Sequence, residues 1–208
     1  MPLAWIMVTL GVGVTAWTRY VPTAEDLLAS FQEAQRFYGA EAYDQAVEQY
    51  EKVGQVHSAL LHVEEVTVTV GEITAPVTEA ALYQSGNAYF KMAQEALRKV
   101  GRGESAADRE KAEREAQTFL ERAVEFFERV ESEATARGLG VLAQSRLVTT
   151  WYEAKEYEQT IVEAQTLISK YPDSKFVENA MYDIAWSHFE QDDYESSIGA
   201  FEALIRHS

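Results

Sequence analysis

The chain lacks cysteine altogether and is poor in proline and in basic residues. Without cysteine it has no disulfides, no thiolate metal ligands, no cysteine nucleophile and no lipid attached through a cysteine. Eighteen Lys and Arg against 34 Asp and Glu give a net charge of −16. Nucleic acid is therefore excluded as a partner, because its affinity comes from neutralised phosphates. Four prolines among 208 residues, with abundant Ala, Glu, Gln and Leu, favour helices.

Residue patterns typical of catalysis and of cofactor or metal binding are also missing. His57 and His62 are five residues apart and do not share a helical face, so they make a poor metal pair. The acidic segment 190–195 lacks the glycine and the distal glutamate of a calcium loop. A phosphate-binding loop follows a strand, and the sequence before the glycines of residues 11–13 predicts none. We therefore predict no enzyme activity, no catalytic residue, no cofactor and no metal.

The composition is that of a folded protein. Hydrophobic residues make up 47% of the chain and aromatic residues 12%, which is enough apolar surface to offset the entropy lost on ordering. The length suits one domain or a short array of repeats.

An apolar run occupies residues 2–17, and the first charge is Arg19. The run is shorter than the roughly 20 residues of a membrane span. It fits a secretory signal peptide cleaved before Trp17, although no basic residue precedes it. An uncleaved membrane anchor and a first helix packed in the fold are the alternatives. Export predicts the periplasm or cell envelope, whereas an anchor followed by Arg19 keeps the body cytoplasmic. We assign residues 1–22 to this leader.

Four segments of the remaining chain, residues 23–208, resemble one another. They are AYDQAVEQYEKV from Ala42, FLERAVEFFERV from Phe119, EYEQTIVEAQTLI from Glu156 and DYESSIGAFEALI from Asp193. They align on the small residues Ala46, Ala123, Thr160 and Ser197, and the last two intervals are both 37 residues. A second helical segment precedes each one, with matching residues Ala34, Gly86, Val148 and Ala185. Paired segments that recur at this period indicate an array of helical hairpins.

This pattern resembles the tetratricopeptide repeat family over about residues 24–208. The resemblance implies an all-α solenoid of about four helix–turn–helix units, at about 24–56, 78–133, 139–172 and 174–208. Tyr171-Pro172-Asp173-Ser174, followed by a helix and DYESSIGAFEALI, looks most like the envelope members: the outer-membrane assembly lipoproteins and the Tol-Pal coordinator type. Those lipoproteins need an N-terminal cysteine, which this chain lacks.

The function implied by the resemblance is that of a non-enzymatic scaffold of the bacterial cell envelope. Such a scaffold binds a peptide or helix of another protein on its concave face. A cytoplasmic or membrane-anchored adaptor, or a helical subunit of an enzyme complex, are the alternatives. The resemblance does not identify the partner protein.

Two insertions interrupt the repeat. In the first, about residues 60–77, Val66, Val68 and Val70 alternate with threonines, which predicts an extended connector or a short strand pair. The second, about residues 98–115, lengthens both helices of one hairpin, which we place at 79–100 and 106–133. Ser105 with Asp108 three residues later predicts a capping box at the start of the return helix.

Aromatic residues share a register in the first helices of the units. Tyr38, Phe90, Tyr152 and Phe189 are equivalent by the repeat, and so are Tyr83 and Tyr182. The resemblance implies that such positions face the concave groove and bind a partner; packing between adjacent first helices is the alternative. Of the residues that a carboxylate clamp needs on this face, only Asn87 is present, so binding of a chaperone tail is not expected.

The tip of the inserted hairpin carries a basic cluster. It comprises Arg98, Lys99 and Arg102. We consider it a candidate contact for an acidic partner surface, with a solvated helix end, favourable near a helix C-terminus, as the alternative.

Two further expectations concern packing. Gly86 takes the place of the small residue where two helices approach, so Gly86→Leu should overpack the pair while Gly86→Ala should be neutral or slightly stabilising. The last helix, about 194–206, carries Ile198, Phe201 and Ile205 with no following helix to cover them. Further repeats, a partner or a second copy of the chain are the expected covers of this end.

Overall fold

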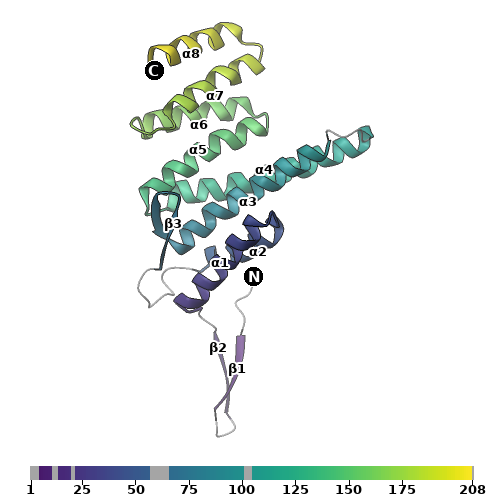
Figure 1. The fold of residues 1–208 in the computed structure, drawn as a ribbon, viewed down its shortest axis with the longest axis vertical. Coiled ribbons are helices and arrows are strands. Elements are labelled where there is room, and N and C mark those ends of the chain that lie inside the picture. The colour runs from purple at the N-terminus through teal and green to yellow at the C-terminus, as the bar shows by residue number, and fades with distance from the viewer. Residues whose placement is uncertain (1–4, 11–13, 20–21, 57–65, 101–104, 208) are drawn as a thin grey trace.

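The computed structural model describes residues 5–10, 14–19, 22–56, 66–100 and 105–207. Within these residues the chain forms eight helices and two small two-stranded sheets. Figure 1 shows the helices stacked in pairs along the long axis of the molecule, with the N-terminal strands at one end and the last helix at the other.

The helices pair in chain order. The pairs are α1 (Ala24–Gly39) with α2 (Tyr43–Gly54), α3 (Val77–Val100) with α4 (Ala106–Glu133), α5 (Arg137–Glu153) with α6 (Tyr157–Lys170), and α7 (Val177–Glu190) with α8 (Tyr194–His207). Each first helix contacts the second helix of the preceding pair, and the first helices also contact one another in order. This arrangement confirms the predicted all-α, tetratricopeptide-like solenoid.

Local sequence signals set the ends of several helices. Thr23 caps α1 and Ser105 caps α4, each in a capping box with the aspartate three residues later. The predicted box at Ser105 is thus confirmed. Pro22, Pro76 and Pro172 all lie outside the helices, because proline lacks the N–H that a helix interior needs.

Small residues lie where paired helices come closest. The residues on which the second-helix segments align are all buried; they are Ala46, Ala123, Thr160 and Ser197. In the second pair, a Cβ added at Gly86 would lie 2.7 Å from Cε1 of the fully buried Phe127. The expectation that Gly86→Ala is neutral is therefore wrong, because a methyl group there has no room without a shift of the ring.

The two insertions form the structures that the sequence predicts. The first contains strands β3 (Thr67–Val70) and β4 (Ile73–Pro76), which pair antiparallel around Gly71 at φ 60°. This short pair contacts α3, and β4 also contacts α5. The second insertion lengthens α3 and α4 to 24 and 28 residues. Figure 1 shows that this hairpin projects sideways from the stack.

The N-terminal run is not helical where it is described. Strands β1 (Trp5–Leu10) and β2 (Val14–Arg19) pair antiparallel, with Trp5 opposite Arg19 and Leu10 opposite Val14. A first helix packed in the fold, one of the three interpretations of this run, is therefore wrong. The expectation that residues 11–13 follow no strand is wrong as well, because β1 ends at Leu10; a strand and not a helix comes after them, which still does not fit a phosphate-binding loop. None of the helices in the described ranges is long and apolar enough to cross a membrane.

Candidate protein-binding surface

Three of the four aromatics that share a register lie in the last turn of a first helix. Each makes an edge-to-face contact with a tyrosine that begins the second helix of the same pair. The ring pairs and centroid distances are Tyr38–Tyr43 at 5.2 Å, Tyr152–Tyr157 at 5.7 Å and Phe189–Tyr194 at 5.4 Å. The shared register is thus explained by a contact within each unit, which sequence reasoning did not consider.

The turns between these helices also share one backbone geometry. Each holds a non-glycine residue with a left-handed backbone: Glu41 at φ 60°, Lys155 at φ 62° and Asp192 at φ 60°. In every case its N–H donates to the carbonyl three residues earlier, and the next N–H donates to the carbonyl five residues earlier. These bonds satisfy carbonyls that the end of a helix leaves unpaired. The aromatic pair brackets this turn.

The long hairpin lacks such a turn next to its register aromatic. Phe90 lies in the middle of α3 and is only 4% exposed. The guanidinium carbon of Arg146, on α5, lies 5.9 Å from the centroid of the Phe90 ring. Tyr83 and Asn87 on the same helix are also buried. Packing between adjacent first helices holds for Phe90, whereas Tyr83 packs on Phe127 of its own pair and Asn87 donates to Gln84 of the same helix. All three side chains present little surface to a partner.

Tyr38 and Arg146 mark the surface that α1, α3 and α5 form together. Tyr38 is half-buried, and burial raises its pKa, an effect that the neighbouring Tyr43 reinforces and Arg146 opposes. The guanidinium of Arg146 therefore lies close to both Tyr38 and Phe90. Arg146 of α5 thus packs over an aromatic ring of the neighbouring first helix α3, and the sequence pattern gave no sign of it.

A cavity of about 210 Å³ lies between α5 and α7. It is lined by Ser145, Val148, Thr149, Leu167, Phe176, Asn179, Ala180, Tyr182 and Asp183. Burial raises the pKa of the Asp183 carboxyl to about 6, and no basic side chain in the described ranges offsets that cause. The cavity thus holds a partly buried carboxylate with no basic partner among the described residues. Sequence reasoning missed it, because an aspartate in an acidic chain carries no distinguishing signal.

Two tyrosines lie near this carboxylate. Tyr182 precedes Asp183 on α7, and Tyr152 lies on the neighbouring helix α5. Burial raises the pKa of Tyr152 first, and the negative charges of Glu190 and Asp183 add to the shift. Tyr182 is 48% exposed and Phe189 is 44% exposed. Tyr182 and Asp183 of α7 therefore share one cavity, and Tyr152 of α5 lies near enough to feel the charge of Asp183.

The basic tip of the hairpin is only partly described. Arg98 is exposed and lies 3.8 Å from Glu95 within its own helix. Arg102 and the side chain of Lys99 lie outside the described residues. The proposed contact with an acidic surface therefore stays a prediction.

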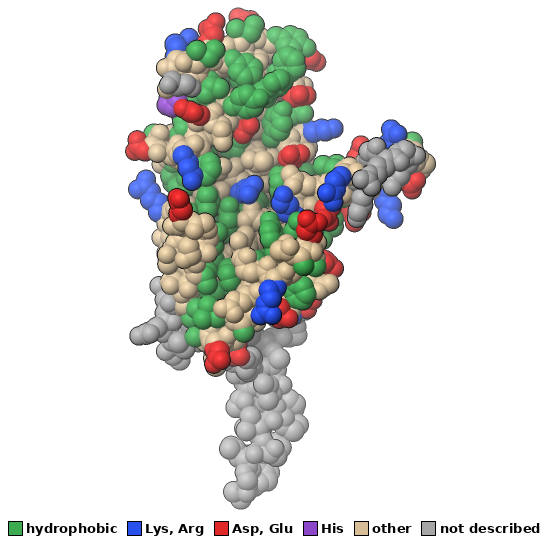
Figure 2. Space-filling model, viewed as in Figure 1, with side chains coloured by type: hydrophobic (Ala, Val, Ile, Leu, Met, Phe, Trp, Pro, Cys, Tyr) green, Lys and Arg blue, Asp and Glu red, His purple; other side chains and the backbone are tan. Residues whose placement is uncertain are grey.

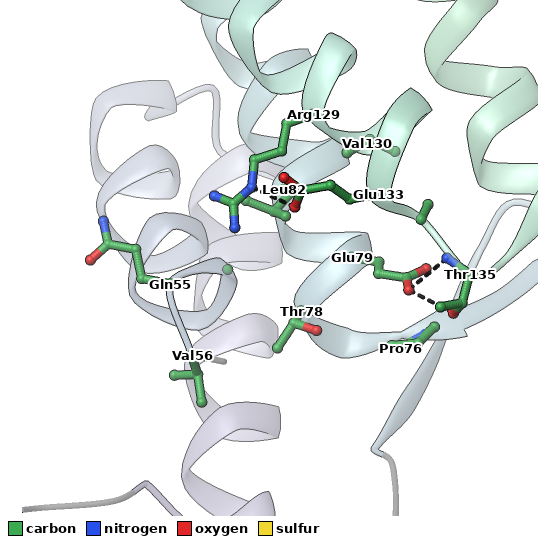
Figure 3. Close-up of a pocket in the computed structure, with 12 residues that line it drawn as sticks. Gln55, Val56, Pro76, Thr78, Glu79, Leu82, Arg129, Val130, Glu133 and Thr135 are labelled. Atoms are coloured by element: carbon green, nitrogen blue, oxygen red, sulfur yellow. Dashed lines mark hydrogen bonds and ion pairs between the residues drawn. The ribbon is translucent and has the colours of Figure 1, made fainter. Parts of the chain in front are cut away.

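A second cavity, of about 220 Å³, lies between the end of α2, the start of α3 and the end of α4 with the residues that follow it. Figure 3 shows Glu79 hydrogen-bonded to Thr135: its carboxylate accepts the backbone N–H at 2.9 Å and the hydroxyl at 2.6 Å. The same carboxylate also accepts the backbone N–H of Ala136 at 3.3 Å. Ala136 is the N-cap residue of α5 and has no capping side chain of its own. Glu79 thus caps the next unit, and we assign this site to the fold.

The described ranges contain no cluster of three or more His, Asp or Glu side chains that could hold a metal ion. The described residues of this surface offer aromatic rings, amides, hydroxyls and single charges.

Comparison with known proteins matches residues 179–207 to the tetratricopeptide repeat family. The match covers most of α7 and α8. No curated protein matches the chain. Tetratricopeptide repeats generally mediate protein–protein interactions and typically belong to non-enzymatic scaffolds.

Proposed function

We propose that this chain is a non-enzymatic scaffold that binds a segment of another protein along the surface formed by its first helices. The segment is an extended peptide or a single helix, and it lies across α5 and α7 beside Tyr152 and Tyr182. The match to the tetratricopeptide repeat supports the class of function.

Asp183 is the observation that carries this proposal. A carboxylate with a pKa raised to about 6 by burial is still mostly ionised at neutral pH, in a site that disfavours its charge. A Lys or Arg side chain from a partner would restore the missing favourable interaction. A partner segment that lacks the cation leaves the free-energy cost of burying this charge uncompensated. The unpaired carboxylate therefore favours segments with a basic side chain over those without one.

The side chains around Asp183 suit the rest of such a segment. Tyr152 and Tyr182 offer ring faces on which an arginine or an apolar side chain packs. Ser145, Thr149 and Asn179 line the same cavity and supply hydroxyl and amide groups for a partner backbone. We infer a binding motif with one basic residue beside an apolar or aromatic one.

A displayed library of random 12-residue peptides, selected against the full chain, tests this proposal. We expect enrichment of peptides with a Lys or Arg next to an aromatic or aliphatic residue. Asp183→Asn should weaken their binding at least tenfold, whereas Glu178→Gln, at an exposed carboxylate of the same helix, should not. Affinity should also fall as the pH drops below about 6, where Asp183 becomes protonated. Enriched peptides without basic residues, or equal binding to both variants, would contradict the proposal.

We further propose a location in the bacterial cell envelope. This rests on the apolar run of residues 2–17 and on the resemblance of the YPDS segment and last unit to envelope proteins. Mass spectrometry of the chain isolated from its own cells tests it. An N-terminus at Trp17 is expected; an intact Met1 or Pro2 in a cytoplasmic fraction would contradict export.

A further inference from the structure

Arg146 and Asp183 occupy equivalent places on two successive first helices. They are 37 residues apart in the chain, which is one repeat period. Gln32 of α1 and Gln84 of α3 take the same place in the first two units, and none of the four residues is buried. Equivalent positions of a solenoid face the same way in each unit. A line of polar side chains therefore crosses the first helices, and we refer to these four residues as the polar line.

Arg146 is a partly buried cation without a counter-charge. In the described ranges three Lys and Arg side chains are partly buried, namely Lys91, Arg122 and Arg146. Lys91 donates to Gln94 at 3.2 Å, and Arg122 forms an ion pair with Glu51 at 3.7 Å. The guanidinium of Arg146 forms neither kind of bond with a described residue and packs over an aromatic ring of α3. Its charge is therefore available to a ligand.

Asp183 is the corresponding anion. Six other partly buried carboxylates of the described ranges accept a hydrogen bond or form an ion pair; they are Asp26, Glu51, Glu79, Glu95, Glu131 and Glu163. Asp183 does neither with any described residue. Burial alone accounts for its raised pKa, so Arg146 is too distant to compensate its charge. Two unpaired charges of opposite sign thus lie one unit apart on the polar line.

The packing of the helices sets the distance between the two charges. First helices that contact each other lie about 8–10 Å apart. An extended chain advances about 3.3 Å per residue, so about three residues bridge this distance, whereas a helix advances about 1.5 Å per residue and needs about six. Ser145 and Thr149 of α5 lie beside the line in the cavity that holds Asp183. Their hydroxyls suit the unpaired backbone groups of an extended segment.

The net charge of the chain gives the cation of this line a particular role. At −16 the chain repels an acidic segment at long range, so binding of an acidic residue depends on individual cations. Figure 2 shows basic side chains set singly among acidic and hydrophobic ones on the visible face of the stack. Complementary charges fix the register of a bound segment and exclude segments with the wrong charge.

We propose that the polar line binds an extended segment of another protein through two opposite charges, an Asp or Glu opposite Arg146 and a Lys or Arg opposite Asp183. The two residues of the segment lie about three positions apart. This inference rests on the proposed function, to which it adds the acidic residue, the spacing and the extended form. Arg146 faces α3 and Asp183 lines the cavity between α5 and α7, so both charges lie between helices of the described array.

Selection of the displayed 12-residue library against three forms of the full chain tests this inference. With the parent chain we expect enriched peptides to carry an acidic and a basic residue about three positions apart. Selection against Arg146→Glu should keep the basic residue and replace the acidic one by a second Lys or Arg. Selection against Asp183→Asn should lose the preference for the basic residue and keep that for the acidic one.

Fluorescence anisotropy of one enriched peptide measures the contribution of Arg146. Arg146→Gln should weaken its binding about tenfold, and should not affect the same peptide with its acidic residue replaced by glutamine. Arg146→Lys should retain most of the affinity, because the charge is retained. Arg137→Gln is the matched control, because Arg137 is an exposed arginine of the same helix, and it should have no effect. Circular dichroism checks that all variants remain helical.

Two results would overturn this inference and leave the proposed function intact. One is enrichment of basic residues without an acidic residue at a fixed spacing. The other is an equal loss of affinity for both forms of the peptide in Arg146→Gln, which would assign Arg146 to packing. A fixed spacing of about six residues would indicate a bound helix and overturn the extended form. Enriched peptides without a basic residue would contradict the proposed function itself, and this inference with it.

Discussion

The long hairpin α3–α4 and the final pair α7–α8 are built on one repeat register but use it differently. Phe90 of α3 is buried and covered by Arg146, whereas the equivalent Phe189 of α7 is exposed and contacts Tyr194 across a tight turn. The insertion in the hairpin moves its turn away from Phe90, and the aromatic contact that brackets the turn is lost with it. Register fixes the position of a side chain on its helix, while the position of the turn decides what that side chain contacts.

The two units also differ in how their helices approach. In the hairpin, Gly86 lies directly against the ring of Phe127, whereas Gly199 of α8 has nothing within 4 Å of an added Cβ. Burial is deep throughout the hairpin's base and shallow on α8, where Ser197 is the buried residue. The central unit is therefore held by packing on both sides, and the final unit presents an uncovered side.

Substitutions at Gly86 and Gly199 should give the largest difference in stability between the two units. Gly86→Ala should destabilise the chain by about 1–2 kcal/mol, because the methyl group meets Phe127, and Gly86→Leu should cost more. Gly199→Ala should stabilise it by about 0.5–1 kcal/mol, because alanine is the better helix former at an open site. Urea unfolding of the three variants measures both effects. A gain in stability for Gly86→Ala would show that the close approach is misplaced.

Removal of the Glu79 carboxylate should weaken the contact between the hairpin and the unit that follows it. Glu79→Gln should cost about 1–2 kcal/mol, since the charged acceptor shared by Thr135 and Ala136 is lost at the start of α5. Glu133→Gln is the matched control in the same cavity, where only an exposed pair with Arg129 is lost, and it should cost at most about 0.5 kcal/mol. Thermal unfolding followed by circular dichroism compares the two; equal losses would remove the capping role.

Asp183 should make stability depend on pH in the C-terminal half. Its pKa is raised from 3.8 to about 6 by burial, so its ionisation destabilises the folded state. This destabilisation grows as the pH rises from about 4 to 6 and is constant above pH 6. Asp183→Asn should therefore stabilise the chain by about 1 kcal/mol at pH 7.5, a value reduced for the partial exposure of the group. At pH 4.5 the gain should be smaller. Denaturant unfolding at the two pH values checks the sign, and a larger gain at pH 4.5 would contradict it.

The left-handed turn residues should give the smallest effects. Lys155→Gly should stabilise the chain by about 0.5–1 kcal/mol, because glycine adopts positive φ without a steric cost. Asp192→Gly should gain less, since it also removes the acceptor that the Tyr194 hydroxyl uses at 2.6 Å. The difference between the two melting temperatures tests the contribution of that bond. Lower stability of Lys155→Gly would show that its backbone does not adopt this geometry.

Much of the architecture was predictable because its signals are local. Small residues 37 apart predicted the helix pairs, alternating valines predicted the β3–β4 strands, and Ser105 with Asp108 predicted the start of α4. The capping box and the alternation each depend on residues a few positions apart, and the repeat period appears when segments of the same chain are compared. The strands in the N-terminal run were missed, because an apolar run without alternation does not distinguish a strand from a helix.

The candidate surface was predictable only in part. The register placed Tyr152 and Tyr182 on first helices, where the structure has them. It gave the same partner-facing position to Phe90, Tyr83 and Asn87, whose side chains the structure buries. Whether a side chain is exposed depends on the side chains of the neighbouring helices that pack over it. The sequence of a single helix does not contain this information. Arg146 and Asp183 were missed for the same reason, since their surroundings come from other units.

The sequence by itself determined the helices, their pairing and the turns between them, since capping residues and prolines act over a few residues and the 37-residue period is visible along the chain itself. Only the tertiary structure decided that Gly86 touches Phe127, that Glu79 caps the helix of the next unit, and that Asp183 lies partly buried between α5 and α7. Those properties depend on distances between segments far apart in the chain, and packing sets these distances after the local elements have formed.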